Sequence, residues 1–222
     1  MINLKNTKIF IGGIQGSGKT YHSVNYIIPA FNNVVVYAVH VDDFKDIQHK
    51  NCKVVSVSDF KMETLDKFCE KVVEVAKNGE CDLFVLDEAD LFLPNNLETL
   101  KSYKNFWDMT INHRHYNLAI LFITRRPQSI ASEVVEQCEH TFLFAISGDN
   151  VKRKMRDIHS GFKPLIPHLD KDKHNFIYFR TGEEPKLYSS AEVIDEEKKD
   201  ITLKEEQANE KTKKRTLPDV KS

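Results

Sequence analysis

Short apolar segments alternate with segments of helical periodicity along this chain. Seven segments are rich in β-branched and aromatic residues: 8–12, 33–39, 53–57, 82–86, 118–124, 140–146 and 175–179. Several of them are apolar throughout rather than at every second position, which is typical of strands buried on both faces of a mainly parallel sheet. We therefore expect a strand at each of these segments.

Helical periodicity fills the intervals between these strands. Apolar residues three and four positions apart predict a helix over residues 62–78, which Gly79 ends, and another over residues 97–116. Shorter helices are expected at residues 20–28 and 149–159. Because strands and helices alternate, the pattern predicts an α/β fold with a mainly parallel central sheet flanked by helices.

The composition changes near residue 190. Of the last 32 residues, 17 are charged and none is aromatic, so this segment cannot bury enough apolar surface to offset its ordering entropy. We expect one folded domain at residues 1–190 and a charged C-terminal tail, helical or disordered, at residues 191–222.

Net charge and hydropathy restrict the cellular setting. The 32 basic residues are balanced by 33 acidic ones, so the chain as a whole has no strong attraction for polyanions or membranes. Its apolar runs are far shorter than the roughly 18 to 20 residues of a membrane helix. Because a strand begins at residue 8, there is also no room for a signal peptide. We expect a cytoplasmic protein without membrane insertion.

The strongest chemical signal is the sequence GIQGSGKT, which follows the first strand and matches G-x-x-x-x-G-K-[ST]. Backbone N–H groups in such a loop point inward and cradle phosphate oxygens, the lysine reaches the β- and γ-phosphates, and the last hydroxyl binds Mg²⁺. The alternative is a glycine-rich turn that binds nothing. The predicted phosphate loop consists of Gly13, Ile14, Gln15, Gly16, Ser17, Gly18, Lys19 and Thr20.

A pair of carboxylates ends the strand at residues 82–86. Ligands of open α/β sheets bind at the carboxyl ends of strands, so Asp87 is expected to hold Mg²⁺ together with Thr20, and Glu88 to orient and deprotonate a water molecule for attack on the γ-phosphate. The alternative is that both residues cap the next helix. Asp90 is expected to be a solvated or capping residue.

Further polar candidates surround the strand at residues 118–124. Thr124 and Arg125 follow its carboxyl end, where a side chain could sense the γ-phosphate, and Arg114 precedes it. An arginine can also stabilise phosphoryl transfer in a neighbouring subunit, and for that role Arg114 is the first choice and Arg125 the second. Ordinary surface charge remains the alternative for each arginine.

Taken together, these residues resemble the FtsK/HerA superfamily of P-loop motors, and within it the small genome-packaging ATPases of double-stranded DNA viruses with internal membranes. The resemblance covers about residues 7–180. It rests on the phosphate loop, the Asp87-Glu88 pair, the Arg-His-Tyr-Asn run at residues 114–117, the Thr-Arg-Arg-Pro run at residues 124–127, and residues 136–144. Arg125 departs from the pattern, because the family commonly has a glutamine sensor there.

The resemblance implies a RecA-like (ASCE) P-loop NTPase that uses ATP and Mg²⁺. It also implies a homohexamer with ATP sites at subunit interfaces and double-stranded DNA threaded through the ring without sequence preference. Such a protein would act in the host-cell cytoplasm, where a capsid or membrane protein at the packaging vertex of the virion could recruit it.

Basic residues that could contact DNA occur in two groups. They are Lys101 and Lys104, and the cluster Lys152, Arg153, Lys154 and Arg156 on the expected helix at residues 149–159. In a ring, copies of a modest basic patch would concentrate their charge at one lumen, and phosphate contacts of this kind are sequence-independent. The alternative is a charged, solvated helix.

The leading prediction is an ATPase that packages double-stranded viral DNA. One rival is the group of filament-assembly or secretion ATPases related to zonula occludens toxin. Their core is similar, but they usually carry a membrane anchor. Another is a small-molecule or nucleotide kinase, which has less use for Glu88 and for which no arginine-bearing lid is evident. A third is a scaffold that binds ATP without turnover, and Glu88 argues against it.

Overall fold

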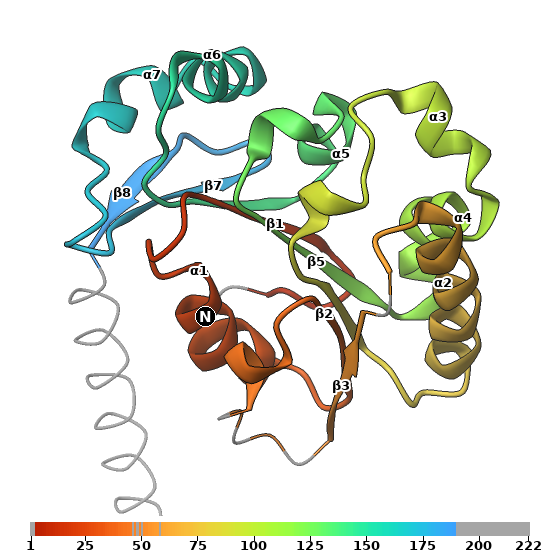
Figure 1. Ribbon diagram of the computed structural model, residues 1–222. Coiled ribbons are helices and arrows are strands. Elements are labelled where there is room, and N and C mark those ends of the chain that lie inside the picture. The colour runs from red at the N-terminus through yellow and green to blue at the C-terminus, as the bar shows by residue number, and fades with distance from the viewer. Residues whose placement is uncertain (1–2, 46, 48, 50, 58, 190–222) are drawn as a thin grey trace, which may run out of the picture.

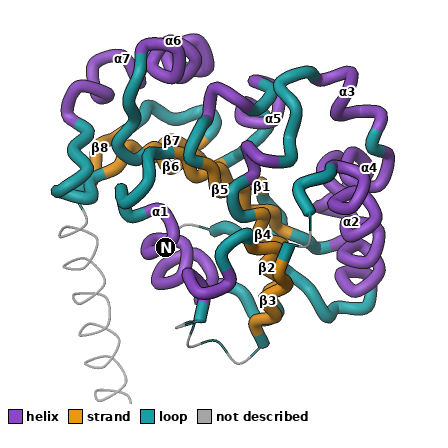
Figure 2. Tube along the Cα trace, viewed as in Figure 1, coloured by secondary structure: helices purple, strands orange, loops and turns teal. Residues whose placement is uncertain are grey.

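The computed structural model describes residues 3–45, 47, 49, 51–57 and 59–189. Within these residues one mixed sheet has the strand order β3-β2-β4-β5-β1-β6-β7-β8, and Figure 2 shows its strands gathered between the helices. The strands are β1 (Lys8–Gly12), β2 (Val34–Ala38), β3 (Cys52–Ser56), β4 (Leu83–Leu86), β5 (Ala119–Thr124), β6 (His140–Leu143), β7 (Phe176–Arg180) and β8 (Lys186–Tyr188).

The pairing is parallel from β3 to β6 and antiparallel for the pairs β6–β7 and β7–β8. The predicted α/β fold with a mainly parallel sheet is therefore confirmed. Since β5 lies between β1 and β4, the carboxyl ends of these three parallel strands meet at one edge of the sheet. This edge carries the phosphate loop and the acidic pair.

Helices cover both faces of the sheet, as Figure 1 shows. On one face lie α2, α4 and α5, and on the other lies α1, which continues as a π-helical stretch (Ser23–Ile27) and a single 3-10 turn (Ile28–Ala30). The α-helices are α1 (Lys19–His22), α2 (Met62–Lys77), α3 (Leu97–Ser102), α4 (Lys104–Asn112), α5 (Ser132–Glu136), α6 (Asp149–Ile158) and α7 (Phe162–Leu165).

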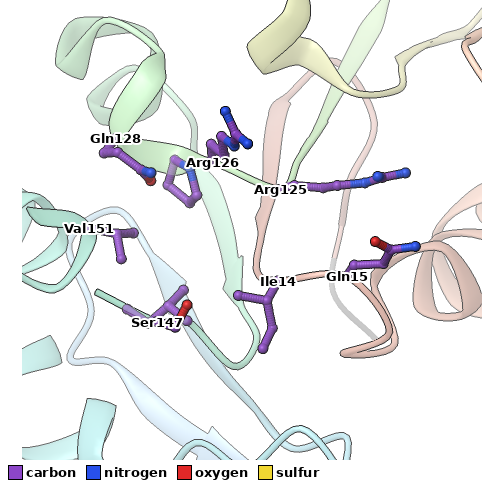
Figure 3. A pocket seen from close by; sticks show the side chains of 9 residues that line it. Ile14, Gln15, Arg125, Arg126, Gln128, Ser147 and Val151 are labelled. Carbon is purple, nitrogen blue, oxygen red and sulfur yellow. The ribbon is translucent and has the colours of Figure 1, made fainter. Parts of the chain in front are cut away.

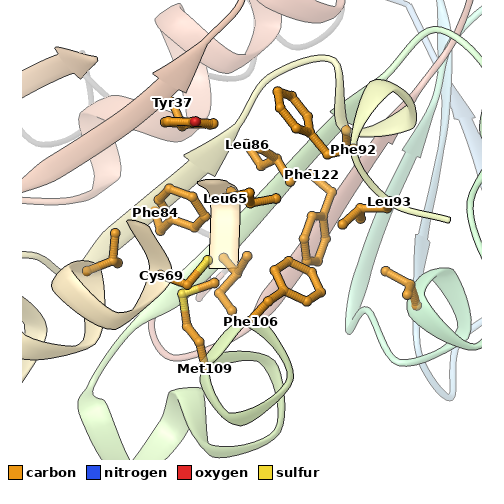
Figure 4. Packing of buried hydrophobic residues seen from close by; sticks show 14 of the residues in the cluster. Tyr37, Leu65, Cys69, Phe84, Leu86, Phe92, Leu93, Phe106, Met109 and Phe122 are labelled. Carbon is orange, nitrogen blue, oxygen red and sulfur yellow. The ribbon is translucent and has the colours of Figure 1, made fainter. Parts of the chain in front are cut away.

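The core follows from strands that are apolar on both faces. Along β4, Phe84 points into the cluster beneath α2 and α4, where it meets Leu65 and Met109, while Val85 points into the cluster on the face of α1. Figure 4 shows the first of these clusters. Each such side chain, fully buried, contributes roughly 1.5 to 3 kcal/mol, and the rigid sheet that results fixes the loops at its carboxyl edge.

Several features of the fold differ from the sequence-based expectation. The strand β8 was not predicted, because its three residues carry no apolar pattern; they are held by pairing with β7 and by the ring of Tyr188, which packs on Phe176. The strand expected at 140–146 ends at Leu143. The charged tail expected at 191–222 lies outside the described residues, so its prediction stays open.

The single helix expected at residues 97–116 is broken at Tyr103, whose backbone (φ −87°, ψ 88°) is not helical. The reason is a contact from α2. Asp66 accepts hydrogen bonds from the backbone N–H of Phe106 (2.8 Å) and from Nδ2 of Asn105 (3.0 Å). Because a carboxylate satisfies free N–H groups at the start of a helix, α4 begins as a separate helix packed on α2.

Candidate functional site

The phosphate loop joins β1 to α1 and is fastened to both neighbouring strands. The N–H of Gly13 donates to the Thr124 carbonyl at the end of β5 (3.2 Å), and the N–H of Ile14 donates to the Ala145 carbonyl beyond β6 (2.8 Å). Gly16 (φ +74°) and Gly18 (φ +102°) adopt left-handed conformations that side chains other than glycine rarely accept. The glycines and the two neighbouring strands together therefore fix the shape of the loop.

Lys19 closes this loop from within. Its side chain is 7% exposed, and Nζ donates to the Ile14 carbonyl (2.9 Å), which also accepts a hydrogen bond from Oγ of Ser17 (2.8 Å). Burial lowers the pKa of Lys19 to about 8, although the charge of Glu88 opposes that shift. Thr20, half-buried, follows in the first turn of α1. The lysine thus lies ready to exchange a carbonyl for a stronger acceptor such as a phosphate oxygen.

The acidic pair lies at the carboxyl end of β4, and both residues are buried. Burial, together with the charges of Glu88 and Asp43, raises the pKa of Asp87 to about 7. Burial also raises the pKa of Glu88, against the influence of Arg125. Glu88 has a left-handed backbone (φ 51°), so the chain turns sharply here. Asp43, whose charge acts on Asp87, was not predicted to belong to the site, because no sequence motif includes it.

Arg125 forms an ion pair with Glu88, with Nη2 of the arginine 2.5 Å from Oε1 of the glutamate. The two side chains come from the ends of β5 and β4, and they are 33% and 11% exposed. Arg125, which stands where the FtsK/HerA resemblance predicts a glutamine sensor, therefore contacts Glu88, the predicted base, within the same chain. Such a contact supports a role of Arg125 in its own site.

Asp90 is half-buried and holds the loop after β5 instead of capping its own helix, a contact that was not expected. Its Oδ1 accepts hydrogen bonds from Oγ1 of Thr124 (2.7 Å) and from the N–H of Arg125 (3.1 Å), while the N–H of Arg126 donates to Oγ1 of Thr124 (3.0 Å). The Thr124 hydroxyl thus fixes the loop after β5 and orients Arg125. Its predicted sensor role stays a prediction.

A cavity of about 250 Å³ adjoins the phosphate loop. It is bounded by Ile14 and Gln15, by residues 125–128 after β5, by residues 146–147 after β6, and by Val151 of α6. Figure 3 shows Arg125 and Gln15 on one side of it and Val151 on the other. The cavity places polar and cationic groups directly beside the loop.

Arg114 lies at the opposite edge of the sheet, because it precedes β5 rather than following it. Its guanidinium pairs with Glu139, whose Oε2 accepts a hydrogen bond from the N–H of Lys8 (2.6 Å) at the start of β1. The fold therefore does not bring Arg114 to the phosphate loop of its own chain. Its side chain is 65% exposed and is therefore accessible to a neighbouring subunit. Its action on such a subunit remains a prediction.

The six basic residues predicted to contact DNA fall into two groups that α5 separates (Figure 1). One group is on α3 and α4, and the other is on α6. Lys101 pairs with Glu98 (2.7 Å), and Lys154 donates to the Ile130 carbonyl and is half-buried. Nη2 of Arg153 donates to Asn150 (3.2 Å). The others are Lys104, Lys152 and Arg156, for which no ion pair occurs within the described part of the chain.

Sequence reasoning missed one segment at the phosphate loop. Residues 169–175 form a turn before β7, and it brings Lys171 against Gly16 and His174 against Gly18. A Lys-Asp-Lys run within a polar stretch is typical of a solvated turn, so the sequence contained no signal for this contact.

Known proteins share this fold. The genome packaging NTPase B204 from Sulfolobus turreted icosahedral virus 2, solved with ATP-gammaS, is 16% identical over 82% of this chain and 97% of its own, with a TM-score of 0.67. The DNA-packaging ATPase B204 from Sulfolobus Turreted Icosahedral Virus is 14% identical over 84% and 98%, with a TM-score of 0.71. The pCW3 conjugation coupling protein TcpA is 13% identical over 84% and 61%, with a TM-score of 0.57. No curated protein sequence matches.

At these identities the neighbours establish the fold alone, and it is the expected fold of FtsK/HerA-type P-loop ATPases. None of the helices in the described residues is long and apolar enough to cross a bilayer. The family model of Zonular occludens toxin (Zot) matches residues 7–147, which include the phosphate loop, the acidic pair and the Thr-Arg-Arg-Pro run. This match covers more than half of the 222 residues, so the chain belongs to the Zot family and has a P-loop NTPase fold.

Proposed function

We propose that this chain is a Mg²⁺-dependent ATPase that moves double-stranded DNA during the packaging of a viral genome. One observation carries the ATPase part of the proposal: the phosphate loop with Lys19 lies at the same sheet edge as the buried Asp87-Glu88 pair. The DNA part is supported by solved proteins of the same fold that are named for genome packaging.

The donor set at this edge suits Mg²⁺. Magnesium prefers carboxylate, hydroxyl and phosphate oxygens, and Asp87 is a buried carboxylate whose charge is disfavoured by its surroundings, so a cation beside it would offset that cost. Thr20 and Asp87 would hold the ion, which would neutralise charge on the phosphates. In the described residues no cluster of three His, Cys, Asp or Glu side chains offers a competing metal site.

The chain's own residues then have distinct roles. Lys19 would give up the Ile14 carbonyl and bind phosphate oxygens. Glu88 would accept a proton from water as the water oxygen forms a bond to the γ-phosphorus, the bond to ADP breaks, and inorganic phosphate leaves. Arg125 would hold the Glu88 carboxylate ionised until water is in place. Hydrolysis rather than transfer is favoured because the Glu88 carboxylate would stand opposite the reacting phosphate, where it can activate water.

The assembly belongs to the same proposal. Six copies would form a ring with ATP sites between subunits, and Arg114, exposed at the edge opposite its own phosphate loop, would act on the neighbour. Lys104, Lys152 and Arg156 would contact DNA phosphates. Such a ring would act in the host-cell cytoplasm and could be recruited to a packaging vertex.

Phosphate release measured with and without double-stranded DNA, beside a screen of small-molecule acceptors, tests the proposal. We expect DNA to stimulate hydrolysis and the stimulation to fall steeply with salt. Transfer of phosphate to a small acceptor would replace the proposal with a kinase. Hydrolysis that no DNA alters would favour the second candidate, a filament-assembly or secretion ATPase, which the Zot family match supports.

The pH dependence of kcat/KM for Mg²⁺-ATP should be bell-shaped. Asp87 must lose its proton to bind a cation, and its pKa is raised to about 7, while Lys19 must keep its proton to bind phosphate, and its pKa is lowered to about 8. Because kcat/KM reports groups of the free enzyme, activity should fall below about pH 7 and above about pH 8. A flat profile from about pH 6 to about pH 9 would contradict these roles.

Arg125→Gln should move the acid limb of that profile to higher pH. The arginine charge lowers the pKa of Asp87 and of Glu88 and partly offsets the effect of burial on each, so its removal should raise both pKa values. The matched control is Arg126→Gln, which removes the next arginine but no contact with Glu88. An acid limb that stays in place in Arg125→Gln would refute the proposed ionising role.

A further inference from the structure

A turn of the chain lies across the phosphate loop from the side of β7. A Cβ atom built on Gly16 would stand 3.0 Å from Cε of Lys171 and 3.3 Å from its Nζ, and one built on Gly18 would stand 3.4 Å from Nδ1 of His174. The contact at Gly16 is tight and involves the end of the lysine side chain, and the contact at Gly18 is an ordinary van der Waals contact. In the sheet order, β6 and β7 lie on the other side of β1 from β4 and β5, so the turn faces the loop from the side away from Glu88.

Hydrogen bonds hold this turn in a defined shape. The side chain of Asn175, only 8% exposed, accepts from the N–H of Asp170 (2.7 Å) and donates to the His168 carbonyl (2.8 Å). His174 adopts a left-handed backbone (φ 48°), which a non-glycine residue keeps only where its surroundings impose it. The position of Lys171 is therefore set by the turn and not only by its own flexible side chain.

The turn is also fastened to the core through the first residue of β7. Phe176 packs against Phe144 (ring centroids 5.2 Å apart) and against His22 (4.8 Å), and His22 lies in the helix that follows the phosphate loop. The loop and the turn thus rest on one aromatic cluster. A ligand held between them would contact two segments that the fold keeps in fixed relation.

The charge of Lys171 has no counterpart in the described part of the chain. Lys173, two residues on, lies 3.7 Å from Asp170, whereas Lys171 makes no ion pair there and its ammonium lies over the backbone of Gly16. Backbone N–H groups of a phosphate loop and a lysine ammonium are both donors. A group that satisfies both at once is an anion with several acceptor oxygens.

We propose that Lys171 is a second phosphate-binding cation of the nucleotide site, and that Lys171 and His174 line this site on the side of β7. Lys19 would bind the phosphates from within the loop and Lys171 from outside it. The proposal rests on the nucleotide-binding function proposed above. It predicts that the site selects nucleoside di- and triphosphates over monophosphates, because the gain from a second lysine grows with phosphate charge.

The test is titration calorimetry of ATP, ADP and AMP with the full-length protein and two variants. Lys171→Gln should weaken ATP and ADP binding about tenfold and AMP binding about twofold or less. It should also reduce the salt dependence of ATP binding, since one ionic contact is lost. Lys173→Gln is the matched control, with the same charge change on the same turn, and should bind as the wild type does. Lys171→Arg should keep most of the affinity.

Three results would overturn the proposal. If Lys171→Gln binds ATP and ADP with the wild-type Kd, Lys171 does not contact phosphate, while the proposed ATPase stands. If Lys171→Gln and Lys173→Gln weaken binding equally, the effect is general electrostatics. If the wild-type protein itself binds no nucleotide, the proposed function and this inference both fail. Thermal melting followed by circular dichroism confirms that each variant is folded.

Discussion

Glu88→Gln is expected to reduce ATP turnover by about 10²- to 10⁴-fold while nucleotide binding is retained. Glutamine keeps the size of the side chain and can still accept a hydrogen bond from Arg125, but it cannot take a proton from the attacking water. Glu88 pairs with Arg125 and not with a residue of the phosphate loop, so the backbone of the loop and the lysine that binds phosphate are kept. Phosphate release and the Kd for ATP, measured on one preparation, separate the two effects.

Glu70→Gln is the control for that change. Glu70 is exposed on α2 and lies outside the site, so the same substitution there should leave both quantities as in the wild type. A Glu88→Gln protein that still turns over ATP at the wild-type rate would show that another group activates water. Loss of ATP binding in Glu88→Gln would instead show that the glutamate belongs to the binding site.

The parts of the site that sequence predicts are those carried by contiguous residues. The phosphate loop needs only its own glycines, lysine and threonine, and the acidic pair needs only the end of one strand. The two could be placed together because parallel strands present their carboxyl ends at one edge. With the strand order β4-β5-β1, Asp87 lies close enough to Lys19 for its charge to act on the pKa of the lysine.

The parts of the fold and of the site that were not predicted depend on contacts between distant segments, and no local sequence pattern indicates such contacts. The hydrogen bond of Asp90 to Thr124 spans 34 residues, and the contact of Asp66 with Phe106 that starts α4 spans 40. Lys171 reaches Gly16 only because β6 and β7 pair in antiparallel fashion. A residue's partner in such cases depends on the assembled sheet, which the sequence pattern specifies only in outline.

Arg114 illustrates how position along a strand decides a role. It lies only ten residues before Thr124, yet β5 runs between them. A strand rises about 3.4 Å per residue, so six residues of β5 put the two ends roughly 20 Å apart. A basic residue before β5 therefore lies at the amino edge of the sheet, whereas one that follows β5 lies near the phosphate loop.

Lys19→Ala is expected to weaken ATP binding by about 10²-fold or more and to bring turnover below detection. Truncating one member of a buried, hydrogen-bonded charge pair costs about 2 to 5 kcal/mol, and Lys19 is the buried cation of the loop. Calorimetry with ATP and Mg²⁺ measures the loss, and Lys67→Ala, on the exposed surface of α2, serves as the control. Wild-type affinity in Lys19→Ala would mean that triphosphate binds elsewhere.

The same variant should leave the fold intact, because the charge of Lys19 is disfavoured in the folded chain. This cost makes stability depend on pH. Burial lowers the pKa of Lys19 to about 8 from its ordinary value of 10.5, so between these values the unfolded chain holds a proton that the folded chain has released. Stability then rises with pH across that interval, and Lys19→Ala should lack this part of the rise. Its melting temperature near pH 7 should be no lower than that of the wild type. A strongly lowered melting temperature would assign Lys19 a structural role that its buried, disfavoured charge does not support.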